Sequence, residues 1–137
     1  MSKHLTQQSS KAVVVDASGL LALIRLEAGA EIVEGLLGNI VMSSVNVSEV
    51  AHILMDLGMS EELCRETIEP FIYKVIEFDT DLAFLSASLK KATKHKGLSL
   101  GDRACIALAI KLKSPVYTSD RVWKELRIEN LDVRLIR

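Results

Sequence analysis

The sequence predicts an α/β fold with helices on both faces of a parallel sheet, and three observations support this prediction. Five short, mostly apolar segments typical of strands alternate with helical segments along the chain. The first of these segments, residues 12–15, is apolar at every position, as in a strand that is buried on both faces. The chain has 137 residues, of which 49% are hydrophobic, a length that suits one domain with its own core. We therefore expect a single three-layer α/β/α sandwich.

The first half of the chain is divided into elements by glycines and by a change of periodicity. Residues 1–11 are polar and are predicted to form a flexible N-terminal tail, so the domain is expected to span residues 12–137. The expected elements are a strand over 12–15, a buried helix over 18–27, a short helix over 30–37, a strand over 40–42, a helix from about 46 to 57 and a helix from 60 to 71.

The second half continues the alternation of strands and helices. Ala104 to Ile110 is apolar at every position, so the helix that contains it must be buried. The expected elements are a strand over 73–78, a helix over 82–92 that ends in a basic stretch, a buried helix opened by Ser99, a strand over 115–118, a short helix over 121–126 and a strand over 133–136.

Composition excludes several classes of protein. The chain carries 17 Lys and Arg against 18 Asp and Glu, so any contact with nucleic acid must use a local basic patch. Cys64 and Cys105 lie far apart and outside any C-x-x-C pair, so we interpret them as buried thiols, which suits a reducing cytoplasm. The N-terminus lacks the apolar core of a signal peptide, and no apolar run approaches the ~20 residues of a membrane span. We expect a cytoplasmic protein with no membrane partner.

Four acidic residues are expected at one edge of the sheet. Asp16 follows the first strand, and Asp120 follows the fourth. Glu49 and Asp102 lie three residues after Asn46 and Ser99, in what we predict to be the first turns of two helices. These positions place all four acids at the carboxyl edge, where open α/β sheets have their sites.

Three of the four acids have a structural alternative. Asn46-x-x-Glu49 and Ser99-x-x-Asp102 both match the spacing of a capping box, and Asp120 fits an N-cap. Asp16 is harder to explain in this way, because it ends an apolar strand and faces an apolar helix, where an unpaired charge is costly.

A divalent cation explains the set of acids better than capping alone. Four carboxylates without Lys or Arg among them would repel each other, and a hard cation such as Mg²⁺ or Mn²⁺ removes that repulsion. No His or Cys stands beside the acids, which disfavours a zinc hydrolase. Carboxylate-held Mg²⁺ or Mn²⁺ suits phosphoryl transfer, in which the metal activates a water.

Four segments carry a family resemblance. They are VVVDASGLLALI, SSVNVSEVAHIL, LSLGDRACIALAI and VYTSDRVW, and they resemble, in order, the four acidic motifs of PIN-domain ribonucleases. The similarity is greatest to VapC-type toxins of bacterial toxin–antitoxin pairs and runs from about residue 12 to the end of the chain. One departure is Ser18, two residues after Asp16, where many members have Asn.

The resemblance implies a fold, an activity and partners. It implies a five-stranded parallel sheet of order 3-2-1-4-5 and Mg²⁺- or Mn²⁺-dependent endonucleolytic cleavage of RNA. Asp16, Glu49, Asp102 and Asp120 would form the acidic site, with Asp16 and Asp102 as the most direct metal ligands. The resemblance also implies a homodimer and inhibition by a small antitoxin of the VapB type, whose tail enters the cleft.

Four residues beside the acids are candidate substrate contacts, each with a structural alternative. Arg103 and Arg121 each follow an acid directly and either balance its charge or touch phosphate. Ser18 and Ser119 are placed to hydrogen-bond a metal-bound water or to cap helices.

Other polar residues also have two interpretations. The basic stretch Lys90 to Lys96 either forms a solvated helix end or receives RNA phosphates. His52, one turn after Glu49, is interpreted as a partly buried polar residue rather than a general base.

Two other function classes were weighed. A phosphoacceptor signalling module is disfavoured, because a single Asp16 ends the first strand and no Lys follows the last strand. A PIN domain that binds RNA or a protein partner without cutting remains the alternative to the ribonuclease.

Overall fold

The sheet has five parallel strands, and its order confirms the expected one. The computed structural model describes residues 11–137, so the predicted N-terminal tail lies outside the described residues except for Lys11. The strands run β3-β2-β1-β4-β5 across the sheet, and all four neighbouring pairs are parallel. Their bounds are β1 (Val13–Val15), β2 (Ile40–Ser43), β3 (Lys74–Ile76), β4 (Val116–Thr118) and β5 (Val133–Leu135).

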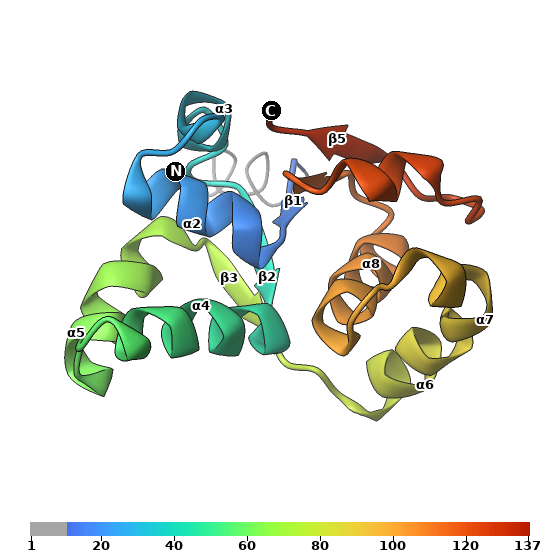
Figure 1. Cartoon of the computed structure of the whole chain (residues 1–137), viewed down its shortest axis with the longest axis horizontal. Coiled ribbons are helices and arrows are strands. Elements are labelled where there is room, and N and C mark those ends of the chain that lie inside the picture. The colour runs from blue at the N-terminus through green and yellow to red at the C-terminus, as the bar shows by residue number, and fades with distance from the viewer. Residues whose placement is uncertain (1–10) are drawn as a thin grey trace.

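Helices cover both faces of this sheet (Figure 1). One face carries α2 (Ala17–Arg25), α3 (Ala30–Glu34), α4 (Ser44–Asp56) and α5 (Glu61–Ile68), the last followed by the short 3₁₀ helix η1 (Glu69–Phe71). The other face carries α6 (Thr80–Ser88), α7 (Lys90–Thr93), the 3₁₀ helix η2 (Lys94–Lys96), α8 (Leu100–Leu112) and the 3₁₀ helix η3 (Arg121–Glu125). This arrangement confirms the predicted three-layer sandwich.

Alternation along the buried strands builds two separate cores. Val13 and Val15 of β1 pack with α2 to α5, whereas Val14 packs with α6 and α8 on the opposite face. This follows from the two-residue repeat of a strand, which sends successive side chains to opposite faces. The wholly apolar β1 therefore supplies both cores.

Helix α8 is the central helix of the second core, as its sequence predicts. Ala104 to Ala109 are all buried, and Trp123 of η3 is fully buried against the same cluster. Both cysteines are buried free thiols, as expected. Within residues 11–137, no helix is both long enough and apolar enough to cross a membrane.

Several element bounds differ from the predicted ones. Helix α4 begins at Ser44 rather than near Asn46, because the Ser43 side chain caps it by accepting from the Val45 N–H at 3.2 Å. Strand β3 is shorter than the predicted 73–78, and it lies at the edge of the sheet, where only β2 pairs with it. The short helix after Gly29 ends at Glu34, before the predicted stop at Gly38.

Candidate active site

Asp16 lies at the carboxyl end of β1, where it caps α2 and accepts hydrogen bonds from two hydroxyl groups. Its Oδ1 accepts from the Gly19 N–H at 2.8 Å and so caps α2. The same oxygen accepts from the Ser18 hydroxyl at 2.7 Å, while Oδ2 accepts from the Thr118 hydroxyl at 2.6 Å. Only 6% of Asp16 is exposed. Every one of these donors is neutral, so the carboxylate is solvated by dipoles and not neutralised by a cation.

These hydroxyl groups also attach the segment after β4 to the end of β1. The Thr118 hydroxyl accepts from the Asp120 N–H at 3.0 Å, and the Ser18 hydroxyl accepts from the Ser119 N–H at 3.0 Å. Two relays therefore run from the Asp16 carboxylate to the backbone that carries Asp120. The sequence indicated Ser18 and Ser119 only as caps or water contacts, and the relays between strands, including the role of Thr118 in them, were missed.

Glu49 is held by the side chain of Asn46, and not by the capping box that the spacing of the two residues predicts. The predicted capping box of Asn46 and Glu49 is wrong, because α4 starts at Ser44 and has no acidic residue in its first turn. Instead, the buried Asn46 amide donates to Glu49 Oε1 at 2.8 Å and to the carbonyl of Gly101 at 3.1 Å. Asn46 thus joins α4 to the start of α8 across the edge of the sheet.

Gly101 provides the space in which the Glu49 carboxylate lies. A Cβ atom at residue 101 would overlap the carboxyl group of Glu49. Gly101 is the second residue of α8, and glycine in a helix is unfavourable relative to alanine, by up to about 1 kcal/mol in the helix interior. Close approach of the Glu49 carboxylate explains this glycine, which sequence reasoning did not single out.

Asp102 and Asp120 each use one oxygen as a helix cap. Asp102 Oδ2 accepts from the Ser99 N–H at 3.0 Å, and Ser99 Oγ accepts from the Asp102 N–H at 3.2 Å, which confirms the predicted capping box. Asp120 Oδ1 accepts from the Val122 N–H at 3.0 Å, which confirms the predicted N-cap. Among the described residues, no donor is bonded to Asp102 Oδ1, Asp120 Oδ2 or Glu49 Oε2. Each of these three acids therefore keeps one oxygen available to a ligand.

The charges at this edge are uncompensated. Within residues 11–137, the ion pairs involve none of the four acids. Burial, with a smaller contribution from the Asp102 charge, raises the pKa of Asp16 to about 6 against the lowering effect of its three hydrogen bonds. Burial also raises the pKa of the Cys105 thiol, and the charges of Asp16, Asp102 and Glu49 add to this. Cys105 is thus an inert thiol beneath three carboxylates.

The chemistry of these donors suits a divalent cation, but their spacing in this structure does not yet do so. All four are carboxylates, the ligands that Mg²⁺ and Mn²⁺ prefer, and no cationic side chain competes for them in the described part of the chain. However, no three His, Cys, Asp or Glu side chains within residues 11–137 are already grouped closely enough to hold one ion. The donor set fits, and the carboxylates would have to converge on the ion.

The remaining candidate residues are distributed around these acids. Arg103 donates from Nη1 to the Leu98 carbonyl at 2.8 Å and so fixes the loop before α8. Arg121 is exposed at the start of η3. The prediction that His52 is partly buried is wrong: its side chain is 75% exposed and contacts Asp56 at 3.4 Å, because it lies on the solvent side of α4.

Among the described residues, two surface cavities lie on α4, and one of them is lined by a candidate site residue, Glu49. A shallow depression of about 480 Å³ is lined by Ser44, Ser48, Glu49 and His52, among others. A more enclosed cavity of about 410 Å³ lies between α4, α5 and β3, has a mostly apolar lining and contains none of the four acids.

The comparisons with known proteins agree with this fold. A family model described as PIN domain matches residues 13–129. No curated protein matches the chain by sequence.

Three solved structures illustrate the likeness. A DNA-bound VapBC from Salmonella typhimurium superposes with a TM-score of 0.71 at 18% identity over 92% of this chain and 98% of that one. A toxin–antitoxin complex from Klebsiella pneumoniae gives a TM-score of 0.70 at 20% identity over 88% of this chain and 95% of that one. VapBC-1 from nontypeable Haemophilus influenzae gives 0.66 at 20% identity over 91% of this chain and 98% of that one. At these identities, the likeness shows a shared fold.

Proposed function

The chain belongs to the PIN-domain family, and we propose that it is a divalent-metal-dependent endoribonuclease that acts as the toxin of a toxin–antitoxin pair. Its substrate is RNA, and its cofactor is Mg²⁺ or Mn²⁺. The proposed site consists of Asp16, Glu49, Asp102 and Asp120, of which two follow strands β1 and β4 and two lie in helices α4 and α8.

One observation carries this proposal: among residues 11–137, the buried Asp16 carboxylate has no cationic partner, and Glu49, Asp102 and Asp120 each keep one oxygen to which no donor is bonded. Asp16 is 6% exposed, and each of its hydrogen bonds comes from a neutral donor. A bound cation would neutralise the charge that burial makes unfavourable.

The chain's own residues would hold and orient this site. Ser18 and Thr118 fix the Asp16 carboxylate and favour its ionised form by donating to it. Asn46 holds one oxygen of Glu49, and among the described residues no donor is bonded to the other. When bound, the metal ion supplies an activated water and neutralises the charge that develops on the phosphate.

The proposed toxin role is supported by the family and by the complexes to which the structural relatives belong. The three described above are VapBC or toxin–antitoxin complexes. We propose by analogy a small VapB-type antitoxin as the partner, a homodimeric state and a cytoplasmic location. Expression without the antitoxin should then arrest growth, and Asp16→Asn should abolish the arrest.

The decisive experiment is cleavage of labelled single-stranded RNA by antitoxin-free protein, in Mn²⁺ and in EDTA. We expect cutting that requires the metal, is lost in Asp16→Asn and persists in Asp56→Asn, a control that removes an exposed acid at the end of α4. Cutting that survives Asp16→Asn would locate the nuclease elsewhere and contradict the proposal.

The alternative, a PIN domain that binds without cutting, predicts a different result. Such a protein would bind RNA or a partner, cut no RNA in a pool of random sequence, and release no heat on titration with Mn²⁺. Binding of Mn²⁺ that is lost in Asp16→Asn would favour the enzyme.

A further inference from the structure

The nearly neutral net charge conceals two oppositely charged parts of the chain. Residues 1–81 contain five Lys or Arg and 13 Asp or Glu, whereas residues 82–137 contain 12 Lys or Arg and five Asp or Glu. The formal charges of the two parts are therefore -8 and +7. Such asymmetry within one domain is a recognised indication of contact with a polyanion.

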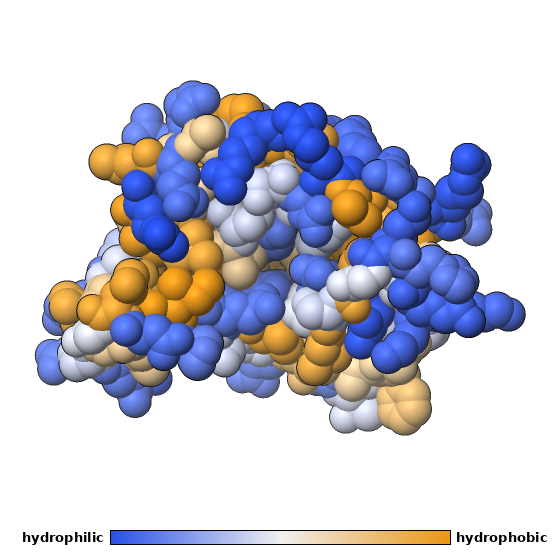
Figure 2. All heavy atoms as spheres, viewed as in Figure 1, coloured by the Kyte–Doolittle hydropathy of each residue, from blue (hydrophilic) through white to orange (hydrophobic). Residues whose placement is uncertain are grey.

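The fold converts this division of the sequence into a division in space. Helices α2 to α5 belong to the acidic part and cover one face of the sheet, while α7, α8 and η3 belong to the basic part and lie on the other. Figure 2 shows hydrophilic side chains gathered on the side of the molecule where α7 lies, whereas an apolar patch lies on the side of α5. The four carboxylates lie at the sheet edge between these two halves.

The basic half contains a compact cationic surface, which we call the basic surface. Its cations are all exposed and come from two segments far apart in sequence: Lys90, Lys91, Lys94 and Lys96 from α7 and η2, and Arg121, Lys124 and Arg127 from η3 and the residue pair beyond it. Lys96 Nζ lies 3.0 Å from Glu125 Oε1, and this ion pair joins the two segments. A depression of about 560 Å³ lies between them, lined by Lys96, Lys124, Glu125, Leu126 and Arg127.

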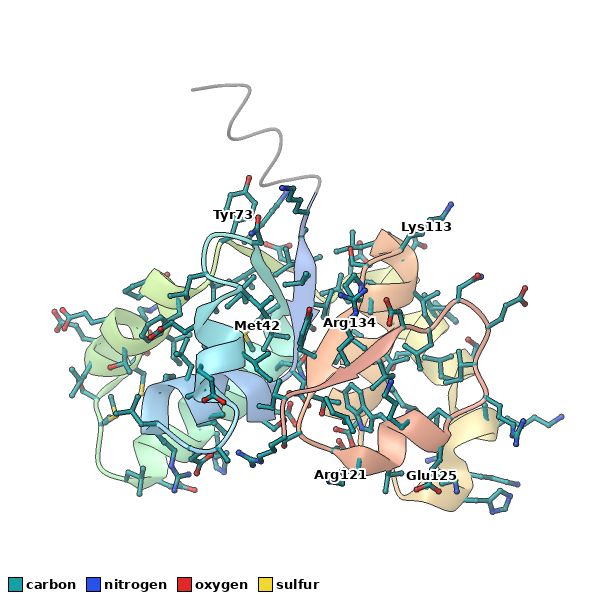
Figure 3. All side chains as sticks on the ribbon, turned by 90° about the horizontal axis from the view of Figure 1, so that it is seen from above. Met42, Tyr73, Lys113, Arg121, Glu125 and Arg134 are labelled. Carbon is teal, nitrogen blue, oxygen red and sulfur yellow. The ribbon has the colours of Figure 1, made fainter. Side chains whose placement is uncertain are left out.

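Both segments lead directly to the acidic site. Helix η3 begins at its cap Asp120, and Lys124 follows within this 3₁₀ helix, roughly 8 Å further along its axis. Lys96 lies three residues before Ser99, the cap that holds Asp102. In Figure 3, Arg121 and Glu125 lie together at one end of the molecule, and Lys113 lies at the opposite end.

We infer that the basic surface binds the phosphodiester backbone of single-stranded RNA and leads it to the four carboxylates. The inference rests on the proposed ribonuclease function and adds the path of the substrate. An RNA strand is repelled by the acidic half, so the basic half is the approach that electrostatics favours. The lone tryptophan is fully buried, so phosphate contacts rather than tryptophan stacking must provide the affinity.

The test measures RNA binding and its salt dependence separately from cleavage. Fluorescence anisotropy with a labelled single-stranded RNA in EDTA compares wild type with Lys94→Gln/Lys124→Gln, which removes one cation from each segment. Each lost phosphate contact lowers the slope of log K against log salt by about 0.7, so we expect a decrease of about 1.4 and binding at least about tenfold weaker at 0.1 M salt. The matched control is Lys74→Gln/Lys113→Gln, with the same change in charge at two exposed lysines outside the basic surface.

A gain of binding provides the complementary test. Glu125 is the acidic residue among those that line the depression, and its carboxylate forms an ion pair with the Lys96 ammonium. Glu125→Gln should release this ammonium for phosphate, tighten RNA binding and steepen the salt dependence. A merely structural role of the Lys96–Glu125 pair would instead leave the salt dependence unchanged.

The outcomes separate this inference from the proposed function. Equal slopes in wild type, test variant and control would overturn the inference, even if wild-type protein cuts RNA. Loss of slope in the test variant alone would support it, even if no cutting were found. Duplex DNA that competes as well as single-stranded RNA would also overturn it, because the surface would then serve another polyanion.

Discussion

The Asp16 carboxylate balances opposing effects at the residue scale. Burial favours its protonated form, and three hydrogen bonds from Ser18, Gly19 and Thr118 favour the charged form. Burial is the larger effect, and the pKa rises from 3.8 to about 6. At neutral pH the metal-free protein therefore holds a negative charge in an unfavourable place.

This pKa predicts that the metal-free protein loses stability as pH rises. Because the folded state binds the Asp16 proton more tightly than the unfolded state, its contribution is complete below about pH 4 and lost as pH rises through 6. A shift of about two units corresponds to about 3 kcal/mol. Urea unfolding between pH 4 and 8 in EDTA should show this loss in wild type but not in Asp16→Asn, since asparagine is neutral and caps α2 equally well. Parallel pH profiles of the two proteins would contradict it.

The close contact of Gly101 with Glu49 predicts a variant that keeps its stability but loses activity. Gly101→Ala adds a methyl group that displaces the Glu49 carboxylate, a flexible group, while alanine itself favours the helix. We expect unchanged or slightly higher stability, by up to about 1 kcal/mol, together with a loss of RNA cleavage. Thermal unfolding and cleavage assays measure both.

The control for this glycine is Gly35→Ala, at the end of α3, where an added Cβ would make a much looser contact with backbone alone. It should leave cleavage unchanged. Equal cleavage by Gly101→Ala and wild type would show that the position of Glu49 does not matter.

Residue-level prediction from the sequence was uneven for physical reasons. Asp102 and Asp120 cap helices as their local spacing predicts, because a cap is formed by residues two or three positions apart. Asn46 and Gly101 meet across 55 residues of sequence, and no local pattern contains that contact. Their roles depend on how α4 and α8 pack, which only the fold determines.

At the scale of elements, the caps that start helices also fix the acids. Ser99 is the N-cap of α8 and holds Asp102, whereas Ser60 is the N-cap of α5, and its helix carries none of the four acids. Each serine accepts from the N–H three residues later, Ser99 at 3.2 Å and Ser60 at 3.1 Å. The two serines therefore cap their helices in the same way, but only Ser99 lies next to one of the four acids.

This pair predicts equal costs in stability and unequal costs in activity. Ser99→Ala and Ser60→Ala should each destabilise the protein by about 1 kcal/mol, measured by urea unfolding. Only Ser99→Ala loosens the turn that carries Asp102, because it removes the hydroxyl that accepts from the Asp102 N–H while it keeps the backbone N–H that donates to the Asp102 carboxylate. Only this variant should therefore lower cleavage and Mn²⁺ affinity. Equal activity of the two variants would mean that the box does not position Asp102.

Elements with strong patterns were predicted well, and exposed edges were predicted poorly. Strand β1 and residues 104–109 of helix α8 are apolar at every position and buried, so sequence and environment agree. Strand β3 is exposed at two of its three residues and paired on one side only, so little constrains its length. The boundary between tail and domain stays a prediction, because residues 1–10 lie outside the described structure.

At the scale of the whole molecule, the strand order makes the strands that precede Asp16 and Asp120 neighbours. Strands β1 and β4 are neighbours, so Asp16 and Asp120 follow adjacent strand ends although they lie 104 positions apart in sequence. Helices α4 and α8 belong to opposite layers and meet at this edge through Asn46 and Gly101. The strand order came from the family resemblance, because strand patterns alone leave the order of a sheet open.

If the four carboxylates bind a metal ion only in the folded protein, metal binding should stabilise the whole fold. A cation that binds the folded protein alone adds RT ln(1 + [L]/Kd), which is about 2.7 kcal/mol at 100 times Kd. Thermal unfolding at pH 8 should shift upward with Mn²⁺, by an amount that rises with the logarithm of its concentration. Asp16→Asn should remove the shift, whereas Lys94→Gln/Lys124→Gln should keep it in full, because the basic surface binds phosphate and not the cation. A shift equal in wild type and Asp16→Asn would place the stabilising ion away from the four carboxylates.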